Sequence, residues 1–262
     1  MSHLAATFTP YGPSHLATLA VVAVAAWAVG KYGGRATTDR GRRRVDLVVG
    51  SVALGQWLVV QALELRPAIF DLQASLPVHI CDLVGLAGAL AVLTNLRVFR
   101  AMLYYWGVGL SIGALFMPEL AGGPESEEFW RFWVPHGAIV VLAAYDIFAR
   151  RYRPAWKDYF IAIGTLVAYL AIIIPVDSAY GLVYGYVGPN RPGYPHLMDF
   201  LGEWPGRLGK LVMATLAFLA AITLPWEYGR RRGRLAATAK AKPAAPQGRR
   251  PMVDGLEDRI SV

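Results

Sequence analysis

Seven apolar stretches, each near the length of a bilayer-crossing helix, constrain this chain more than any other feature of its sequence. They cover residues 14–29, 45–65, 76–94, 98–117, 129–149, 155–176 and 207–228. A membrane-spanning helix needs ~20 mostly apolar residues, and lipid offers no water to an open backbone. The stretches lack the alternation of a membrane β-barrel. The sequence therefore predicts an all-α, polytopic membrane helix bundle with about seven transmembrane helices.

The composition argues against the soluble classes of protein. Hydrophobic residues make up 55% of the chain and charged residues only 17%, whereas ~25% charge is typical of soluble domains. A single cysteine excludes an intrachain disulfide and a zinc site built from several cysteines. The net charge of +8 would suggest nucleic acid as a partner of a soluble protein. In this chain the positions of the charges indicate membrane topology instead.

The basic residues predict the orientation of the chain. Of the 26 Lys and Arg, 21 lie on one predicted side: 19 in the tail or in the loops that follow the first, third and fifth stretches, and two within the first three residues of the next stretch. Positive residues mark the cytoplasmic side, so we expect the N-terminus outside and the C-terminus inside a cell membrane crossed many times. The bilayer is then the expected partner, and nucleic acid is not. The sequence leaves the oligomeric state open.

The apolar stretches and the composition of the tail predict two domains of unequal size. Residues 1–228 are expected to form one transmembrane helical domain. Residues 229–262 are rich in Ala, Lys, Pro and Arg and have no periodic apolar face. This composition predicts a disordered, basic cytoplasmic tail.

The third stretch carries two ionisable side chains, His79 and Asp82. Such groups are costly in the hydrocarbon, at ~3 kcal/mol on insertion scales, so each is a candidate site residue. A helix across this stretch would place His79 and Asp82 on one face, where Asp82 would hold one imidazole nitrogen and leave the other free for proton transfer. The opposing interpretation for His79 is a structural hydrogen bond to a neighbouring helix.

A second histidine, His136, lies in the fifth stretch between Pro135 and Gly137, where the helix is expected to be irregular. The predicted topology places His79 and His136 in the outer half of the bilayer, ~6 Å apart in depth. We therefore predict a shared site with His79, His136 and Asp82 as catalytic candidates. The substrate-binding candidates around them are Glu64 at the end of the second stretch, Tyr105 in the fourth, and Asn190 in the long loop 177–205.

Cys81 is a further candidate, as a nucleophile, but the helical geometry argues against it. Residues two apart on a helix point roughly 160° away from each other, so one straight helix would not pair Cys81 with His79. We therefore expect Cys81 to be a buried thiol, and a Cys81→Ser variant to keep most of its activity.

Four segments give the chain a family resemblance: LPVHICDL at 76–83, YWG at 105–107 continuing to LFMPEL at 115–120, FWVPHG at 132–137 and LGEWP at 201–205. Together they resemble the YwaF family of bacterial integral membrane proteins over residues 45–228. Distant vertebrate relatives of that family are similar to membrane acyltransferases that act on lipids, with a Cys and a His in the bundle. The resemblance implies roles for His79 and His136 and a lipid-directed acyltransferase or hydrolase.

Three classes of function stay open at this level. The first is an enzyme acting on lipid acyl groups near the outer leaflet, with a histidine as general base and Cys81, Ser111 or water as nucleophile. The second is a transporter or ligand-sensing bundle without chemistry. The third is a metal-dependent enzyme, since His and carboxylate ligands suit Zn or Fe; its ligands would be His79, Asp82, His136 and Glu64. The sequence names no cofactor.

Overall fold

The structure is a computed structural model that describes residues 7–189 and 200–241. Within these ranges every regular element is helical, with one isolated bridge between Thr7 and Gly122. The helices in chain order are α1 (Pro13–Tyr32), α2 (Asp39–Glu64), α3 (Ile80–Thr94), α4 (Arg97–Met102), η1 (Leu103–Ser111), α5 (Gly113–Phe116), α6 (Glu127–Ala144), η2 (Tyr145–Ala149), α7 (Trp156–Tyr180), η3 (Tyr184–Tyr186) and α8 (Gly206–Ala241).

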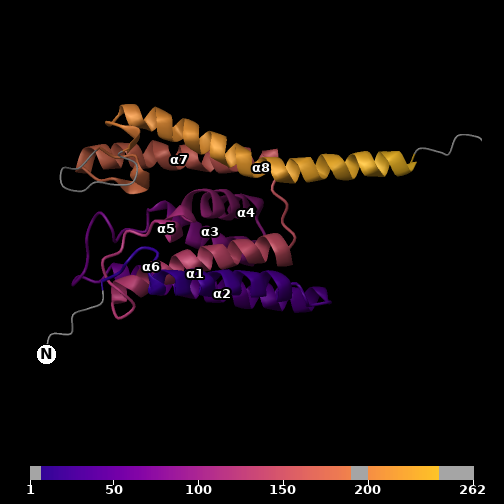
Figure 1. Cartoon of the computed structure of the whole chain (residues 1–262), viewed down its shortest axis with the longest axis horizontal. Helices are drawn as coiled ribbons and strands as arrows, with labels where there is room; N and C mark the ends of the chain where they lie inside the picture. The colour runs from indigo at the N-terminus through magenta and orange to yellow at the C-terminus, as the bar shows by residue number, and fades with distance from the viewer. Residues whose placement is uncertain (1–6, 190–199, 242–262) are drawn as a thin grey trace, which may run out of the picture.

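The long helices run side by side along the long axis of the molecule (Figure 1). Helices α1, α2 and α6 lie on one side, α7 and α8 on the other, and α3 to α5 between them. In the described part of the chain six helices are long and apolar enough to cross a membrane, and α3 is a shorter apolar helix. The predicted class, a helical membrane bundle, is confirmed.

The bundle exposes many large apolar side chains, as expected of a protein surrounded by lipid, and its interior contains small residues at close helix contacts. Helix α3 packs through small residues at its centre, where a Cβ at Gly88 would lie 3.0 Å from Leu142. Small residues let membrane helices approach closely. On the outside, Val52 and Ile172 are 67% and 68% exposed. In a bilayer, these exposed apolar side chains face the acyl chains of the lipids.

Two boundaries differ from the sequence prediction. The third helix begins at Ile80 rather than at residue 76, because residues 66–79 form turns before it. Its 15 residues span ~22 Å, less than the ~30 Å hydrocarbon core. Helix α8 continues past Tyr228 to Ala241, so residues 229–241 are helical where we expected disorder. The remainder of the predicted tail, residues 242–262, lies outside the described residues.

The segment Arg97–Phe116 contains an unusual helix. Its middle, η1, is a nine-residue π-helix between α4 and α5. π-helical turns are rare and are often found at functional sites. Two glycines allow close packing of neighbours here, since a Cβ at Gly109 would lie 2.5 Å from Leu219 of α8. The wider helix leads directly to the cavity described below.

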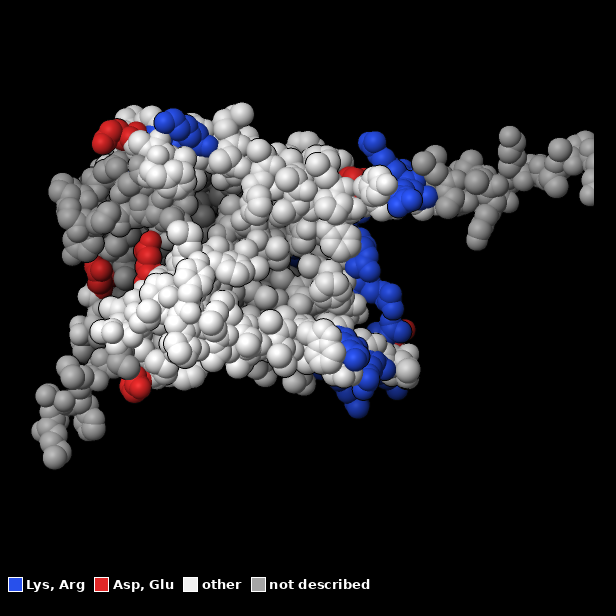
Figure 2. Space-filling model, viewed as in Figure 1, with Lys and Arg blue, Asp and Glu red and all other residues white. Residues whose placement is uncertain are grey.

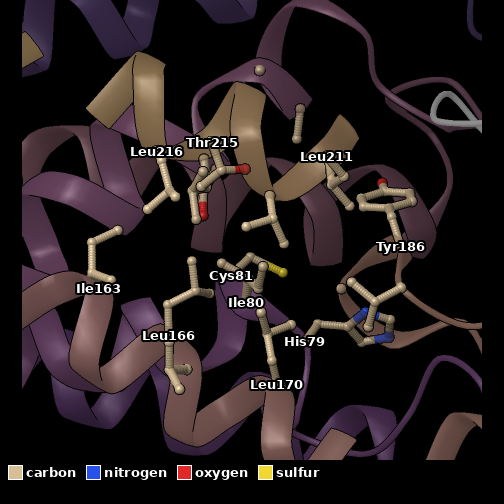
Figure 3. Close-up of a pocket in the computed structure, with 18 of the residues that line it drawn as sticks. His79, Ile80, Cys81, Ile163, Leu166, Leu170, Tyr186, Leu211, Thr215 and Leu216 are labelled. Atoms are coloured by element: carbon tan, nitrogen blue, oxygen red, sulfur yellow. The ribbon is translucent and has the colours of Figure 1, made fainter. Parts of the chain in front are cut away.

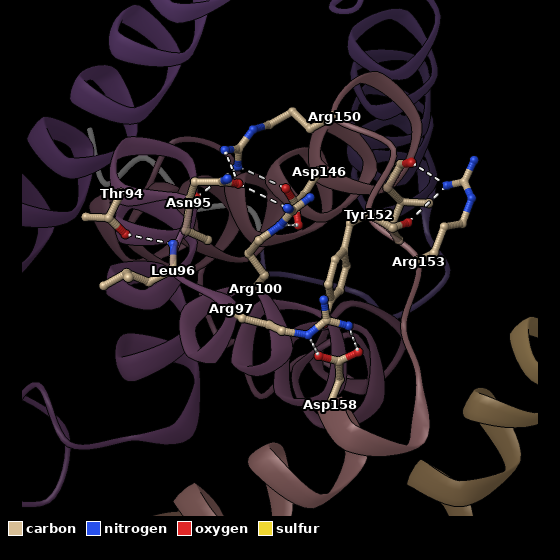
Figure 4. A network of polar contacts seen from close by, with 12 residues as sticks. Thr94, Asn95, Leu96, Arg97, Arg100, Asp146, Arg150, Tyr152, Arg153 and Asp158 are labelled. Atoms are coloured by element: carbon tan, nitrogen blue, oxygen red, sulfur yellow. Dashed lines mark hydrogen bonds and ion pairs between the residues drawn. The ribbon is translucent and has the colours of Figure 1, made fainter.

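Buried ion pairs join the helices at one end of the bundle (Figure 4). Asp146 accepts hydrogen bonds from Arg100 and Arg150, both at 2.9 Å, and all three side chains are largely buried. Asp158 is fully buried and receives a bidentate pair from Arg97 at 2.6 and 2.7 Å. Asp146 and Arg150 lie one helical turn apart, and their ion pair is part of a larger network.

Charge is segregated along the bundle. Figure 2 shows most of the visible Lys and Arg at one end and most of the visible Asp and Glu at the other. We predict that a phosphatase reporter fused after Ala241, which is active only when exported, will be inactive, because the positive end stays in the cytoplasm. The same reporter fused after Gly123, in the loop that follows the fourth predicted span, should be active. Activity after Ala241 would overturn the orientation.

Candidate functional site

An apolar cavity of about 300 Å³ lies between the α7–α8 pair and the centre of the bundle. Its wall contains two histidines and the single cysteine of the chain, together with apolar residues of α7 and α8 (Figure 3). The polar or sulfur-containing side chains that line it are His79, Cys81, Ser111, Met117, Glu119, His136, Tyr186 and Thr215. The cavity is therefore lined partly by side chains that can take part in chemistry and partly by apolar side chains.

His79 is the N-cap of α3, with extended backbone angles (φ −63°, ψ 152°). Its Nε2 lies 2.9 Å from the carbonyl oxygen of Gln73, and its ring packs edge-on against Tyr184 at 4.7 Å between centroids. A carbonyl only accepts, so Nε2 is the donor and carries the proton of the neutral ring. Nδ1 is then the basic nitrogen.

Asp82 lies in the first turn of α3 and does not orient the His79 ring. Its Oδ1 accepts a 3.2 Å hydrogen bond from Gln61, and its carboxylate faces the backbone N–H of His79. The predicted arrangement was wrong because His79 is not helical, so the i,i+3 geometry does not apply. Asp82 instead caps the start of α3 and does not line the cavity.

His136 lies within α6, next to the helix-internal Pro135. Its Nδ1 donates to the carbonyl of Phe132 at 2.8 Å, and its ring stacks on the Phe132 ring at 4.3 Å. By the argument used for His79, the second nitrogen, Nε2, is the basic one. His136 is close enough to His79 for the two rings to interact electrostatically. Both histidines thus reach the cavity with one nitrogen fixed and one available.

Cys81 is the second residue of α3, and its side chain lines the cavity. The residue is half-buried rather than fully buried. Cys81 and Asp82 lie in the first turn of α3, where backbone N–H groups have no partner within the helix. Our expectation that helix direction separates Cys81 from His79 was wrong, because the helix begins only at Ile80 and leaves both side chains on one cavity wall (Figure 3).

Of the three predicted substrate-binding residues, the structure describes Glu64 and Tyr105, and neither lines the cavity. Glu64 accepts a 2.8 Å hydrogen bond from Arg131 and does not line the cavity. Tyr105 is fully buried, and its hydroxyl lies 2.8 Å from that of Thr223. Asn190 lies outside the described residues.

Several polar residues around the site were not predicted. Thr215 of α8 and Tyr186 of η3 line the cavity, and loss of hydration raises the pKa of the Tyr186 phenol to about 12. The Ser111 hydroxyl, considered from the sequence as a possible nucleophile, also lines it and has no hydrogen-bond partner within the described ranges. Asp177 was placed in a loop by the sequence but is a fully buried residue of α7. A lone Thr or Asp within or next to an apolar stretch was the signal available in the sequence.

A metal site finds no support in the described residues. They contain no group of three or more His, Cys, Asp and Glu side chains that could hold an ion. Of the four ligands considered from the sequence, His79 and His136 line the cavity, whereas Glu64 pairs with Arg131 and Asp82 accepts a hydrogen bond from Gln61.

The helical bundle, its apolar exterior and its charge segregation define a polytopic helical membrane protein. The chain belongs to the TMEM164 family, whose family model matches residues 10–223. No curated protein and no solved structure gives a significant match to the chain. The match establishes a transmembrane protein family, and the more specific likeness to the YwaF proteins stays an expectation.

Proposed function

We propose that this membrane protein transfers or hydrolyses acyl groups of lipids in the cavity, with Cys81 as nucleophile and a histidine as general base. One observation carries the proposal: the only cysteine of the chain and two histidines line a single cavity. A nucleophile beside a base whose second nitrogen is held by another group is the recurring arrangement of acyl-transfer sites.

The histidines supply the base that the thiol needs. In an apolar cavity a thiol does not ionise unaided, so its proton must pass to a neighbouring group during attack. The basic nitrogens are Nδ1 of His79 and Nε2 of His136, since the opposite nitrogens donate to backbone carbonyls. The carbonyl bonds also fix the orientation of each ring.

The start of α3 supports the developing negative charge. The first N–H groups of a helix have no partner within the helix, and the helix dipole favours negative charge there. The N–H groups of Cys81 and Asp82 belong to this first turn of α3. Backbone donors in this position are suited to stabilising an oxyanion.

The chemistry balances without a cofactor. The Cys81 thiol gives its proton to an imidazole while sulfur bonds to the carbonyl carbon of a lipid ester. The ester carbon–oxygen bond breaks, and the leaving alkoxide takes the proton from the imidazolium. An acceptor hydroxyl, from a second lipid or from water, then gives its proton to the imidazole and attacks the thioester. The carbon–sulfur bond breaks and the sulfur regains the proton.

We predict that His136→Ala lowers the rate of acyl transfer by about 10²-fold or more, the usual contribution of a general acid–base group. The assay uses the protein in liposomes, with a phospholipid carrying a labelled acyl chain and a lysophospholipid as acceptor, and follows label transfer and release. Val134→Ala is the matched control, because Val134 lies on the same helix and is 42% exposed.

A parallel His79→Ala variant should show a loss of the same kind. Wild-type protein that neither transfers nor releases the label would overturn the proposal and favour a transporter or ligand-sensing protein. Unchanged rates in both histidine variants would remove the histidines from the chemistry.

A further inference from the structure

We infer that the apolar part of the cavity between α7 and α8 holds a single acyl chain, and that Ile163 and Leu216 limit the length of that chain. The inference rests on the proposed function, which needs an acyl carbonyl beside Cys81. It adds the position, direction and length limit of the chain that carries this carbonyl.

The polarity of the cavity changes along its length. Figure 3 shows Tyr186 and His79 toward one end and Ile163, Leu166 and Leu216 toward the other, with Cys81 between them. An acyl chain has the same distribution, with a polar carbonyl at one end and hydrocarbon beyond it. The chain therefore fits in one direction, with its carbonyl at Cys81 and its methyl end toward Ile163.

Ile163 and Leu216 are the deepest lining residues on their helices. Helix α7 contributes lining residues from Ile163 to Leu170, and α8 contributes them from Leu211 to Leu216. The predicted topology runs these helices in opposite directions, so Ile163 and Leu216 are both the innermost members. Beyond them Tyr159 approaches the Leu216 carbonyl, with its hydroxyl 3.5 Å from that oxygen. Aromatic packing of Tyr159 against Tyr105 continues further inward.

The depth of this part of the cavity suits a hydrocarbon segment of moderate length. Seven helical residues separate Ile163 from Leu170, a rise of ~10 Å. With carbon–carbon bonds of about 1.5 Å, an extended chain advances ~1.25 Å per carbon, so ~8 methylenes fill that depth. The chain length that fits is thus set by two side chains at the closed end.

The entrance lies where acyl chains are found. Val167 of α7 and Val212 of α8 line the cavity and are also 59% and 40% exposed on the outside of the bundle. Both side chains are apolar and belong to helices long enough to span a membrane. A lipid therefore enters sideways from the bilayer, past these two valines, without its chain crossing water.

The test uses phospholipids with a diazirine at the methyl end of one acyl chain, in a series of increasing chain length. Full-length Cys81→Ala protein in nanodiscs is photolysed, so that binding is measured without turnover, and the labelled peptides are identified. The expected label falls on residues 159–166 of α7 and 215–219 of α8 for chains that fill the cavity.

Ile163→Ala should extend the preferred chain by one to two carbons, and Ile163→Phe should reduce labelling by the wild-type-preferred length by about tenfold, since a methylene in a closed pocket is worth 10-fold or more. Leu216→Ala repeats the extension on the other helix. Ile172→Ala and Ile172→Phe are the controls, because Ile172 is 68% exposed on the same helix and does not line the cavity.

Label on the exposed face of α7, or a length preference that is the same in wild type and in both Ile163 and Leu216 variants, would overturn the inference. A correct labelling pattern and length shift in a wild-type protein that transfers no acyl group would support the inference and overturn only the proposed chemistry.

Discussion

Cys81→Ala is expected to reduce acyl transfer by at least ~10³-fold, because removal of a covalent nucleophile abolishes the step that the remaining groups assist. The thiol lines the same cavity as both histidines and lies in the first turn of α3. Folding should be little affected, since the change removes one half-buried sulfur atom. The measurement is label transfer in liposomes, with the amount of folded protein checked by gel filtration in detergent.

Ser111→Ala is the informative companion of this variant. Ser111 also lines the cavity, and its hydroxyl has no hydrogen-bond partner within the described part of the chain. With Cys81 as nucleophile, Ser111→Ala should keep a rate within a few-fold of wild type. Full activity in Cys81→Ala together with loss in Ser111→Ala would assign the nucleophile to the hydroxyl.

Asp146→Ala is expected to lower the free energy of unfolding by ~3–5 kcal/mol, the usual cost of leaving a buried charge without its partner. Asp146 is 1% exposed and accepts hydrogen bonds from both Arg100 and Arg150. Its removal leaves two largely buried guanidinium groups: Arg100 loses its carboxylate partner, and Arg150 keeps Asp46 at 3.4 Å. Thermal unfolding in detergent should show a lower midpoint.

The control for this variant is an exposed ion pair at the opposite end of the bundle. Arg66 and Glu127 form an ion pair in which both side chains are more than 40% exposed. Glu127→Ala should cost no more than ~1 kcal/mol, because solvent screens such pairs. Equal losses in Asp146→Ala and Glu127→Ala would contradict the importance assigned to the buried network.

The bundle was predictable because its determinants are local. Runs of apolar residues specify spanning helices, and Lys and Arg predict their direction. The choice of His79, His136 and Cys81 was also within reach, since polar groups in apolar stretches are costly and rare. The position of these three side chains around one cavity could not be predicted, because it depends on the residue at which α3 begins.

The start of α3 is set by contacts distant in the sequence. Residues 66–79 form turns in which Gln73 binds the His79 ring through its carbonyl and accepts the Val183 N–H through its side chain. Neither contact leaves a pattern in the apolar run itself. The π-helix η1 is likewise invisible to periodicity, since it forms where α6 and α8 pack against glycines.

The most direct test of the central claim is the detection of an acyl group on Cys81 itself. Because Cys81 is the only cysteine, a thioester on the protein maps to a single residue. Protein incubated with a labelled phospholipid and no acceptor lipid, then quenched in acid, should carry the acyl mass on the peptide containing Cys81, and neutral hydroxylamine should remove it. Acyl transfer at the wild-type rate with no label on Cys81 at any quench time would contradict the account.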